Sequence, residues 1–317
     1  MQHPSVLWFP RLLPKVFVAM ALVPLLGVCQ TVKETVQKGS PQDQLMSALY
    51  VGYFLPSGMR DIGAEEGWRN LKLDASSLLA RSPEDTTLKF VVAFADGELA
   101  RRAKDFRTAE AQFQSASVLN RNFALPYLAL AETALDKGDS SSAHGMLYAA
   151  SIEVPKTVPA SFLHLAFTRL GELYERDGKF TDALKAYKSA VEAKPKWLGG
   201  RTTLAATYLK LNQAALALPQ AQEAIAIAPK DAYANALLGQ VQSRLGHHES
   251  AVRAFKNAIE IDPGNANYQY MLGLEYESSG KKLDALHCYN AAKLIAERDK
   301  SYGELLPNIQ QALSRLQ

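Results

Sequence analysis

A small or apolar residue recurs every 34 residues along the second half of the chain. Within each period, apolar positions are separated by 3, 4 or 7 residues, the spacing of one face of an amphipathic helix. Two of the columns hold alanine in four successive periods and a third holds leucine: Ala183, Ala217, Ala251 and Ala285; Ala190, Ala224, Ala258 and Ala292; Leu170, Leu204, Leu238 and Leu272. Each leucine precedes a glycine or an alanine, which allows two helices to approach closely. The pattern predicts one pair of helices in each period.

Turn-forming residues follow the same period. The middle of each unit holds Gly178, Asn212, Gly246 or Gly280, and three of the units have a proline near their end: Pro195, Pro229 and Pro263. Glycine and asparagine adopt the left-handed conformation that ends a helix, and proline stops a second helix before the next unit begins. A single pair would expose its apolar face, so neighbouring pairs must stack to bury it.

The period and its content resemble the tetratricopeptide repeat, whose pattern is W-x2-L-G-x2-Y…A-x3-F…P. The matching residues are Leu170-Gly171-x2-Tyr174…Ala183-x3-Tyr187…Pro195 and Leu238-Gly239…Ala251-x3-Phe255…Pro263. The resemblance implies an all-α fold, a right-handed superhelical solenoid of antiparallel helix pairs. It also implies a protein or peptide partner.

The repeat phase predicts six units between residues 90 and 299: 90–123, 124–157, 164–197, 198–231, 232–265 and 266–299. In the second unit, Pro155 is expected to close the second helix. Six extra residues, 158–163, follow that unit. They are best explained by a third unit whose first helix starts early and runs about 17 residues. A flexible joint between an N-terminal and a C-terminal half is the alternative.

Less regular segments flank the repeats. Residues 41–89 are expected to form a degenerate helical repeat that caps the stack, with helices at about 42–54 and 65–81. Ser40 and Ser82 each precede a proline and lie three residues before an aspartate, so each is expected to cap a helix. Residues 300–317 are expected to contain a final helix, at about 308–316, that covers the last apolar face.

The first 29 residues have the layout of a secretory signal peptide or a lipoprotein signal. Arg11 and Lys15 precede an apolar run at 16–28, which is shorter than the roughly 20 residues needed to span a bilayer. Cys29 ends a Leu-Gly-Val-Cys sequence similar to a lipidation box, although Val28 departs from that pattern. We therefore expect an exported protein, periplasmic or membrane-anchored, with residues 30–40 as a tether. An uncleaved signal anchor and a buried N-terminal helix remain alternatives.

Charge and motifs narrow the possible functions. The net charge is only +3, without the basic patch of a nucleic-acid-binding protein. No nucleophile elbow, phosphate loop or HExxH motif occurs. His247, His248 and Glu249 lie at a turn without a third ligand at suitable spacing. We therefore predict no enzyme activity, no catalytic residues, no metal site and no cofactor.

In tetratricopeptide arrays the first helix of each pair lines a concave groove. Placed on this chain by the resemblance, the groove residues are Phe94, Glu98, Arg101, Glu132, Asp136, Thr168, Glu172, Glu175, Thr202, Lys210, Tyr233, Gln240, Arg244 and Tyr270. Glu98, Glu132 and Glu172 share one column, and an acidic strip there would favour a basic partner. The alternative is that these glutamates pair with arginines one turn along their own helices.

The sequence thus predicts a protein- or peptide-binding scaffold or assembly factor that uses its concave groove. The alternative function is a membrane-tethered accessory subunit of a cell-envelope assembly or secretion machine. No nucleic-acid partner is expected, and homo-oligomerisation stays open.

Overall fold

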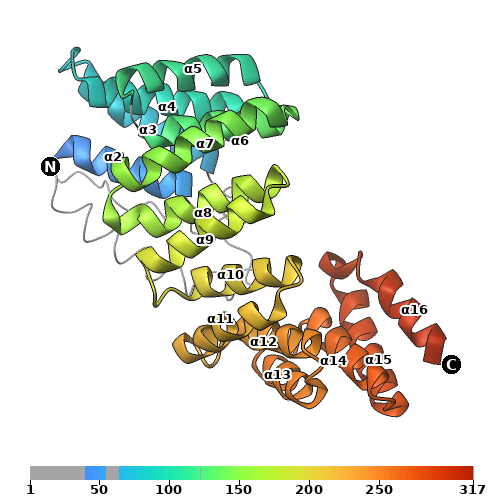
Figure 1. Cartoon of the computed structure of the whole chain (residues 1–317). Coiled ribbons are helices and arrows are strands. Elements are labelled where there is room, and N and C mark those ends of the chain that lie inside the picture. Colours follow the sequence, from blue (N-terminus) through green and yellow to red (C-terminus); the bar gives the residue numbers. More distant parts are fainter. Residues whose placement is uncertain (1–39, 55–63, 122, 317) are drawn as a thin grey trace, which may run out of the picture. The chain divides into compact units, whose positions relative to one another are not determined.

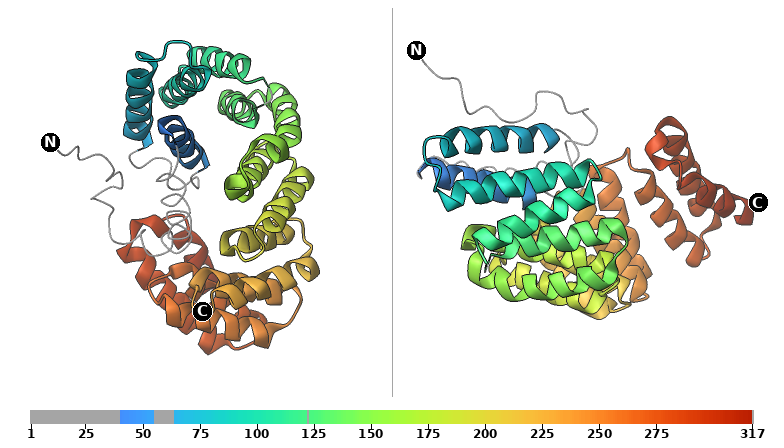
Figure 2. Two further views of the ribbon diagram at one scale, coloured as in Figure 1. Left: turned by 90° about the vertical axis from the view of Figure 1, so that its left-hand side faces the viewer. Right: turned by 90° about the horizontal axis from the view of Figure 1, so that it is seen from above.

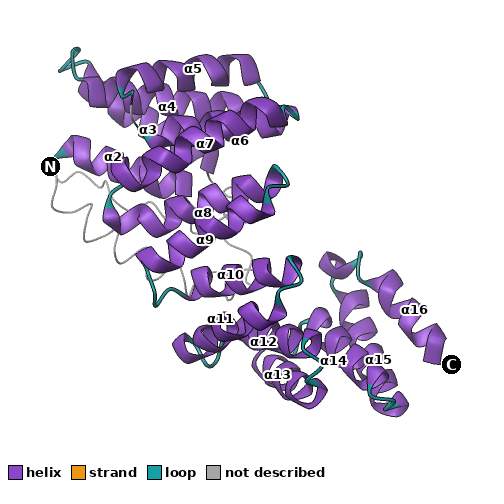
Figure 3. Cartoon of the chain, viewed as in Figure 1, coloured by secondary structure: helices purple, strands orange, loops and turns teal. Residues whose placement is uncertain are grey.

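The computed structural model describes residues 40–54, 64–121 and 123–316. The expected signal sequence, Cys29 and nearly all of the tether lie outside the described residues. Within the described ranges every regular element is a helix and none is a strand, as Figure 3 shows. The predicted all-α array of helix pairs is confirmed.

The chain forms two compact units, residues 1–193 and 194–317, which are described separately (Figure 1). The helices of unit 1 are α2 (Pro41–Phe54), α3 (Ala64–Leu79), α4 (Thr86–Arg102), α5 (Phe106–Leu119), α6 (Ala124–Lys137), α7 (Ser140–Thr157), α8 (Ala160–Arg176) and α9 (Phe180–Ala193). Those of unit 2 are α10 (Leu198–Lys210), α11 (Ala214–Ile227), α12 (Ala232–Arg244), α13 (His248–Ile261), α14 (Ala266–Ser278), α15 (Lys282–Arg298), the 3-10 turn η2 (Lys300–Tyr302) and α16 (Leu306–Leu316).

The turn inside each pair contains one residue in the left-handed conformation. The four predicted residues adopt it, and so does the residue at the same place between α6 and α7, all with φ between 57° and 79°: Gly178, Asn212, Gly246, Gly280 and Gly138. Lys104 takes the same place between α4 and α5, with φ 61°, although lysine lacks the conformational freedom of glycine. Helices α9, α11 and α13 each end two residues before a predicted stop at proline.

Two expected helix boundaries are wrong. Pro155 does not end the second helix of its unit but lies inside α7, which runs on to Thr157. The last turn survives because Val158 N–H donates to the Val154 carbonyl at 3.2 Å and the Thr157 hydroxyl donates to the Glu153 carbonyl at 2.8 Å.

The second wrong boundary is at Ser82. Ser40 caps α2 as expected, and Asp43 closes the capping box by accepting from Ser40 N–H at 2.9 Å. Ser82, in contrast, belongs to a turn in which its carbonyl accepts from Asp85 N–H at 3.0 Å. Asp85 is the cap of α4 and accepts from Leu88 N–H at 3.0 Å.

The six-residue insertion at 158–163 lengthens the first helix of the third unit, as the sequence predicted. Helix α8 is 17 residues long and starts at Ala160, directly after Pro159, so the expected early start is confirmed. The division between the two compact units does not fall at the insertion. It falls between Ala193 and Lys194, at the end of α9.

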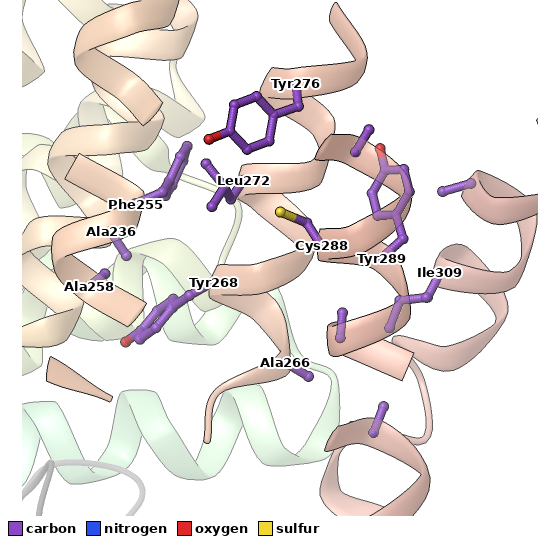
Figure 4. Packing of buried hydrophobic residues seen from close by; sticks show 14 of the residues in the cluster. Ala236, Phe255, Ala258, Ala266, Tyr268, Leu272, Tyr276, Cys288, Tyr289 and Ile309 are labelled. Carbon is purple, nitrogen blue, oxygen red and sulfur yellow. The ribbon is translucent and has the colours of Figure 1, made fainter. Parts of the chain in front are cut away.

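The two helices of a pair meet where a small residue faces a large one. Gly239 of α12 lies under the ring of Phe255 in α13, and a Cβ atom on Gly239 would come within 2.7 Å of that ring. Figure 4 shows Phe255 beside Leu272 in the buried core of unit 2. Gly97, Gly171 and Gly273 face Phe113, Tyr187 and Tyr289 in the same way.

Where the small residue of the first helix is alanine and not glycine, the residue opposite it on the second helix is smaller than an aromatic side chain. Ala131 lies 16 positions before Leu147, and Ala205 lies 16 positions before Ala221, the same separation as between Gly239 and its ring. Glycine therefore accompanies an aromatic residue, and alanine accompanies leucine or alanine. The sizes compensate across the pair, which keeps the two helices close at native packing density.

At the C-terminal end, α16 covers the last pair as predicted. Ile309, Ala312 and Leu313 are buried in the core of unit 2. Arg315 also binds Glu277 of α14, with 3.1 Å between its Nη2 and the carboxylate. This pairing lowers the pKa of Glu277 below its usual value.

We expect Gly239→Ala to destabilise unit 2 although alanine is the better helix former. The added methyl group would collide with the Phe255 ring, and overpacking of this kind costs about 1–3 kcal/mol. Denaturant unfolding followed by circular dichroism measures the loss.

The matched test is the double variant Gly239→Ala with Phe255→Leu, which copies the natural Ala131 and Leu147 pair. A double-mutant cycle should show favourable coupling between the two substitutions. Additive effects would contradict the proposed size compensation.

Candidate functional site

Two glutamates of the expected acidic strip are buried. Glu98 in α4 is 1% exposed and Glu132 in α6 is 4% exposed. Glu98 binds Arg101 at 3.0 Å and Arg102 at 3.8 Å. Neither carboxylate is presented to solvent, so these two residues do not form an open acidic surface.

Glu132 is at the centre of a network that joins three first helices of unit 1. Its carboxylate binds Arg101 from α4 at 3.3 Å, and Arg169 and Arg176 from α8, the latter at 3.7 Å. Asp136 bridges the same helices, at 2.7 Å from Arg101 and 2.5 Å from Arg176. We call the residues joined in this way the arginine–carboxylate network: Glu98, Arg101, Arg102, Glu132, Asp136, Arg169, Glu172 and Arg176.

This network corrects the interpretation of the acidic column. The alternative of paired helix faces holds for Glu98 and Arg102, whereas Glu172 binds Arg169 at 3.1 Å. Burial acts to lower the pKa of Arg101, but the neighbouring charges of Glu98 and Glu132 outweigh it and raise that pKa. The carboxylates therefore stabilise unit 1 internally, which removes the basis for a basic partner at this position.

We expect Glu132→Gln to destabilise unit 1 by about 3–5 kcal/mol, because it leaves buried arginine charge without its partner. Hydrogen exchange of the α6 and α8 amides measures the effect locally. Asp136→Asn is the matched control, since its side chain is 25% exposed and the loss there should be nearer 1 kcal/mol. Equal protection in both variants would contradict a structural role for Glu132.

The remaining predicted residues of unit 1 serve packing or local bonding. Phe94 is completely buried, against Tyr53 and Phe113. The Thr168 hydroxyl donates to the His164 carbonyl at 2.9 Å. Glu175 is half-buried on α8.

In unit 2, the structure brings four predicted residues together around one open pocket. Lys210, Tyr233, Gln240 and Arg244 lie on α10 and α12 and line a cavity of about 420 Å³. We call this cavity the unit 2 pocket. Its other lining residues are Ala206, Leu209, Leu237, Ser243, Phe255, Met271, Leu274 and Glu275.

Two other predicted residues of unit 2 are not in this lining. Thr202 is buried, and its hydroxyl donates to the Leu198 carbonyl at 3.1 Å. Tyr270 is half-buried, with its ring centroid 5.7 Å from that of Tyr289.

The unit 2 pocket combines apolar and charged groups. Tyr233 and Leu274 are 46% and 37% exposed, and both line the same cavity. Glu275, in contrast, is 5% exposed and is occupied within the protein. Its carboxylate accepts from the Ser243 hydroxyl and contacts His248 Nδ1 at 2.9 Å.

Sequence reasoning missed several residues of this pocket. Leu274 lies 34 residues after Gln240, in a column that was predicted to face the groove. It could have been found by including apolar residues of that column. Met271 contacts Gln240 Nε2 at 3.3 Å but lies outside the columns considered, so no sequence signal indicated it.

No set of three or more His, Cys, Asp or Glu residues suited to a metal ion occurs within residues 40–54, 64–121 and 123–316. In the same ranges, no helix is both long and apolar enough to cross a membrane. His247 and His248 bind different groups, because His247 Nδ1 contacts Gln242 at 2.8 Å.

Two sequence profiles described as tetratricopeptide repeat match the chain, at residues 128–196 and 232–265. They cover α6 to α9 and the pair α12 and α13. The chain is a tetratricopeptide-repeat protein. Such proteins are scaffolds for protein–protein interaction and are generally non-catalytic.

Several solved structures are similar to this chain, and one of them, with a TM-score above 0.5, shares its fold. The APC/C hetero-tetramer Cut9-Hcn1 has a TM-score of 0.51 at 17% identity, over 92% of this chain and 53% of that chain. MamA from Desulfovibrio magneticus RS-1 has a TM-score of 0.48 at 20% identity, over 56% of this chain and 96% of that chain. YrrB, described as a TPR protein with an unusual peptide-binding site, has a TM-score of 0.45 at 23% identity, over 58% and 91%. No curated protein sequence matches this protein.

Proposed function

We propose that this tetratricopeptide-repeat protein binds a partner protein through the unit 2 pocket, and that the bound segment is apolar at its centre and acidic at its edge. One observation carries the proposal. The pocket presents exposed apolar side chains next to exposed cations, while its own carboxylate is bound within the protein.

The apolar part of the pocket supplies anchoring contacts. Tyr233 and Leu274 lie on neighbouring first helices, α12 and α14, and the half-buried Met271 of α14 lines the same pocket. A partner side chain placed there would remove this apolar area from water, which contributes about 25 cal/mol per Å². Exposed aromatic residues in such positions are frequent centres of binding energy.

The charged part of the pocket selects the sign of the partner. Arg244 and Lys210 are exposed at its rim. The carboxylate of Glu275 is engaged by Ser243 and His248, so it contributes little negative surface. An acidic residue beside the apolar anchor would meet the arginine, and guanidinium–carboxylate pairs add geometric specificity as well as energy.

The fold supports this mechanism because the lining residues lie on packed helices. A rigid surface orders little on binding, so less of the interaction energy is lost to conformational entropy. A helical or extended segment can lie along α10, α12 and α14. The protein thereby acts as a scaffold that holds one partner in a fixed position.

We expect Arg244→Glu and Leu274→Glu each to weaken capture of the partner by about tenfold or more, equivalent to at least about 1.4 kcal/mol. Partners are captured from native extract on the immobilised protein, identified by mass spectrometry, and their affinities are then measured for each variant.

The controls make the same chemical changes on second helices. Arg253→Glu on α13 and Leu283→Glu on α15 alter exposed side chains outside the unit 2 pocket and should leave binding unchanged. A partner that all four variants bind equally would contradict binding at the pocket.

We also propose that the protein is exported and held at a membrane as an accessory subunit of an envelope machine. The basic start, short apolar run and Cys29 box of residues 1–29 support this second function. One lipid chain gives marginal anchoring and several give stable anchoring, so a lipid on Cys29 would set the location of the scaffold.

Cys29→Ser should release most of the protein from the membrane fraction if Cys29 is lipidated, because the acylated sulfur is lost. Fractionation with immunoblotting measures the distribution. Cys288→Ser is the control, since that thiol is buried in unit 2. Equal membrane retention of the Cys29 variant and the unaltered protein would exclude the lipid tether.

A further inference from the structure

Helix α2 presents an apolar stripe to the rest of unit 1. Leu45, Leu49, Tyr50, Tyr53 and Phe54 are all buried. Their spacing of four, five, eight and nine residues from Leu45 is that of one helix face. Figure 2 shows α2 on the inner side of the curve formed by the following helices of unit 1.

The stripe reaches the first helices of three consecutive pairs. Tyr50 stacks on Phe162 in α8, with 5.1 Å between ring centroids, and meets the edge of Phe123, directly before α6, at 5.9 Å. Tyr53 contacts Phe94 in α4 at 5.4 Å. Helix α2 contacts α3, its neighbour in the chain, but it also contacts α4 and α8 and therefore lies across several pairs.

Helix α2 also covers the arginine–carboxylate network. The guanidinium of Arg169 lies over the Tyr53 ring, 5.6 Å from its centroid. On its other sides Arg169 binds Glu132 and Glu172. The tyrosine thus occupies a place on this surface that favours a cation–aromatic contact.

The link from α2 to the repeats differs from the links inside the pairs. From α4 onward the two helices of each pair are joined by two or three residues, whereas residues 55–63 separate α2 from α3. A Cβ atom on Gly52 would lie 3.4 Å from the Trp68 ring, an ordinary contact, whereas one on Gly239 would come within 2.7 Å of the Phe255 ring. Helix α2 therefore lacks both the short turn and the close glycine–aromatic approach that join the two helices of a pair.

We propose that α2 is an internal ligand of unit 1, and that the surface beneath it binds a partner helix of the same chemistry when α2 is displaced. The partner helix presents a leucine and aromatic residues at the spacing of Leu49, Tyr50 and Tyr53 and carries little charge. Asp43, in the first turn, is the one charged residue of α2 itself. Helix-in-groove recognition uses this kind of apolar stripe.

The proposal is independent of the unit 2 pocket, because every contact that carries it lies in unit 1. The simpler alternative is that α2 is a permanent part of the core of unit 1. The two views differ in whether α2 can be exchanged while α4, α6 and α8 stay folded.

The test uses the full chain with a protease site inserted within residues 55–63, so that cleavage separates α2 from the repeats. A fluorescent peptide of residues 41–54 is added, and its binding is followed by anisotropy. We expect saturable exchange of the cleaved segment for the labelled peptide. Hydrogen exchange of α4 and α8 should keep its protection once the labelled peptide is bound.

Two peptide variants report on recognition. A peptide with Tyr50→Ala and Tyr53→Ala should bind at least tenfold more weakly, and one with Ala48→Gln, an exposed position, should bind like the parent. In the uncut chain, Tyr50→Ala with Tyr53→Ala should open the surface to the labelled native peptide, which the unaltered uncut chain excludes.

Failure of the labelled peptide to exchange, or loss of α4 and α8 protection in the bound complex, would overturn the proposal and make α2 a core element. Equal binding of the native and double-alanine peptides would also overturn it. Arg244→Glu should not change any of these results, so a failure here is distinguishable from a failure of the unit 2 pocket.

Discussion

Close approach of the two helices in each pair is the constraint on which the array depends. It requires that the residue on the first helix shrink where the facing side chain grows, as Gly239 does beneath Phe255. In a solenoid each repeat is stabilised chiefly by its own contacts and by those with its nearest neighbours. The free-energy cost of a poorly packed pair therefore falls on that pair and the pairs beside it, because no single core spans all the repeats. The compensation between alanine and leucine at 131 and 147 keeps this spacing without a glycine.

The sequence predicted those parts of the fold that depend on residues close together in the chain. Turn glycines, proline stops and the early start of α8 are local, and they were found. The helix ends expected at Pro155 and Ser82 were wrong, because hydrogen bonds made by neighbouring residues determine where α7 ends and where α4 begins. The burial of Glu98 and Glu132 depends on arginines from other helices, so the column pattern could not distinguish an open strip from a closed network.

The two units use the same kind of surface differently. In unit 1 the first helices direct their polar side chains at one another and receive α2, so their inner face is largely occupied. In unit 2 the equivalent face remains open at the unit 2 pocket. Four residues of this pocket could be predicted because the position of a residue in the repeat determines which way its side chain points: Lys210, Tyr233, Gln240 and Arg244. Met271 could not, because its exposure follows from how α12 and α14 pack.

Lys104 strains the turn between α4 and α5. A residue with a side chain is strained by roughly 1 kcal/mol in the left-handed region, and the corresponding turns at Gly138, Gly178, Gly246 and Gly280 avoid that strain. The α4–α5 hairpin therefore has a smaller margin against fraying than the hairpins whose turn contains glycine. Within unit 1, thermal fraying is therefore expected to start at the α4–α5 turn sooner than at the glycine turns of α6–α7 and α8–α9.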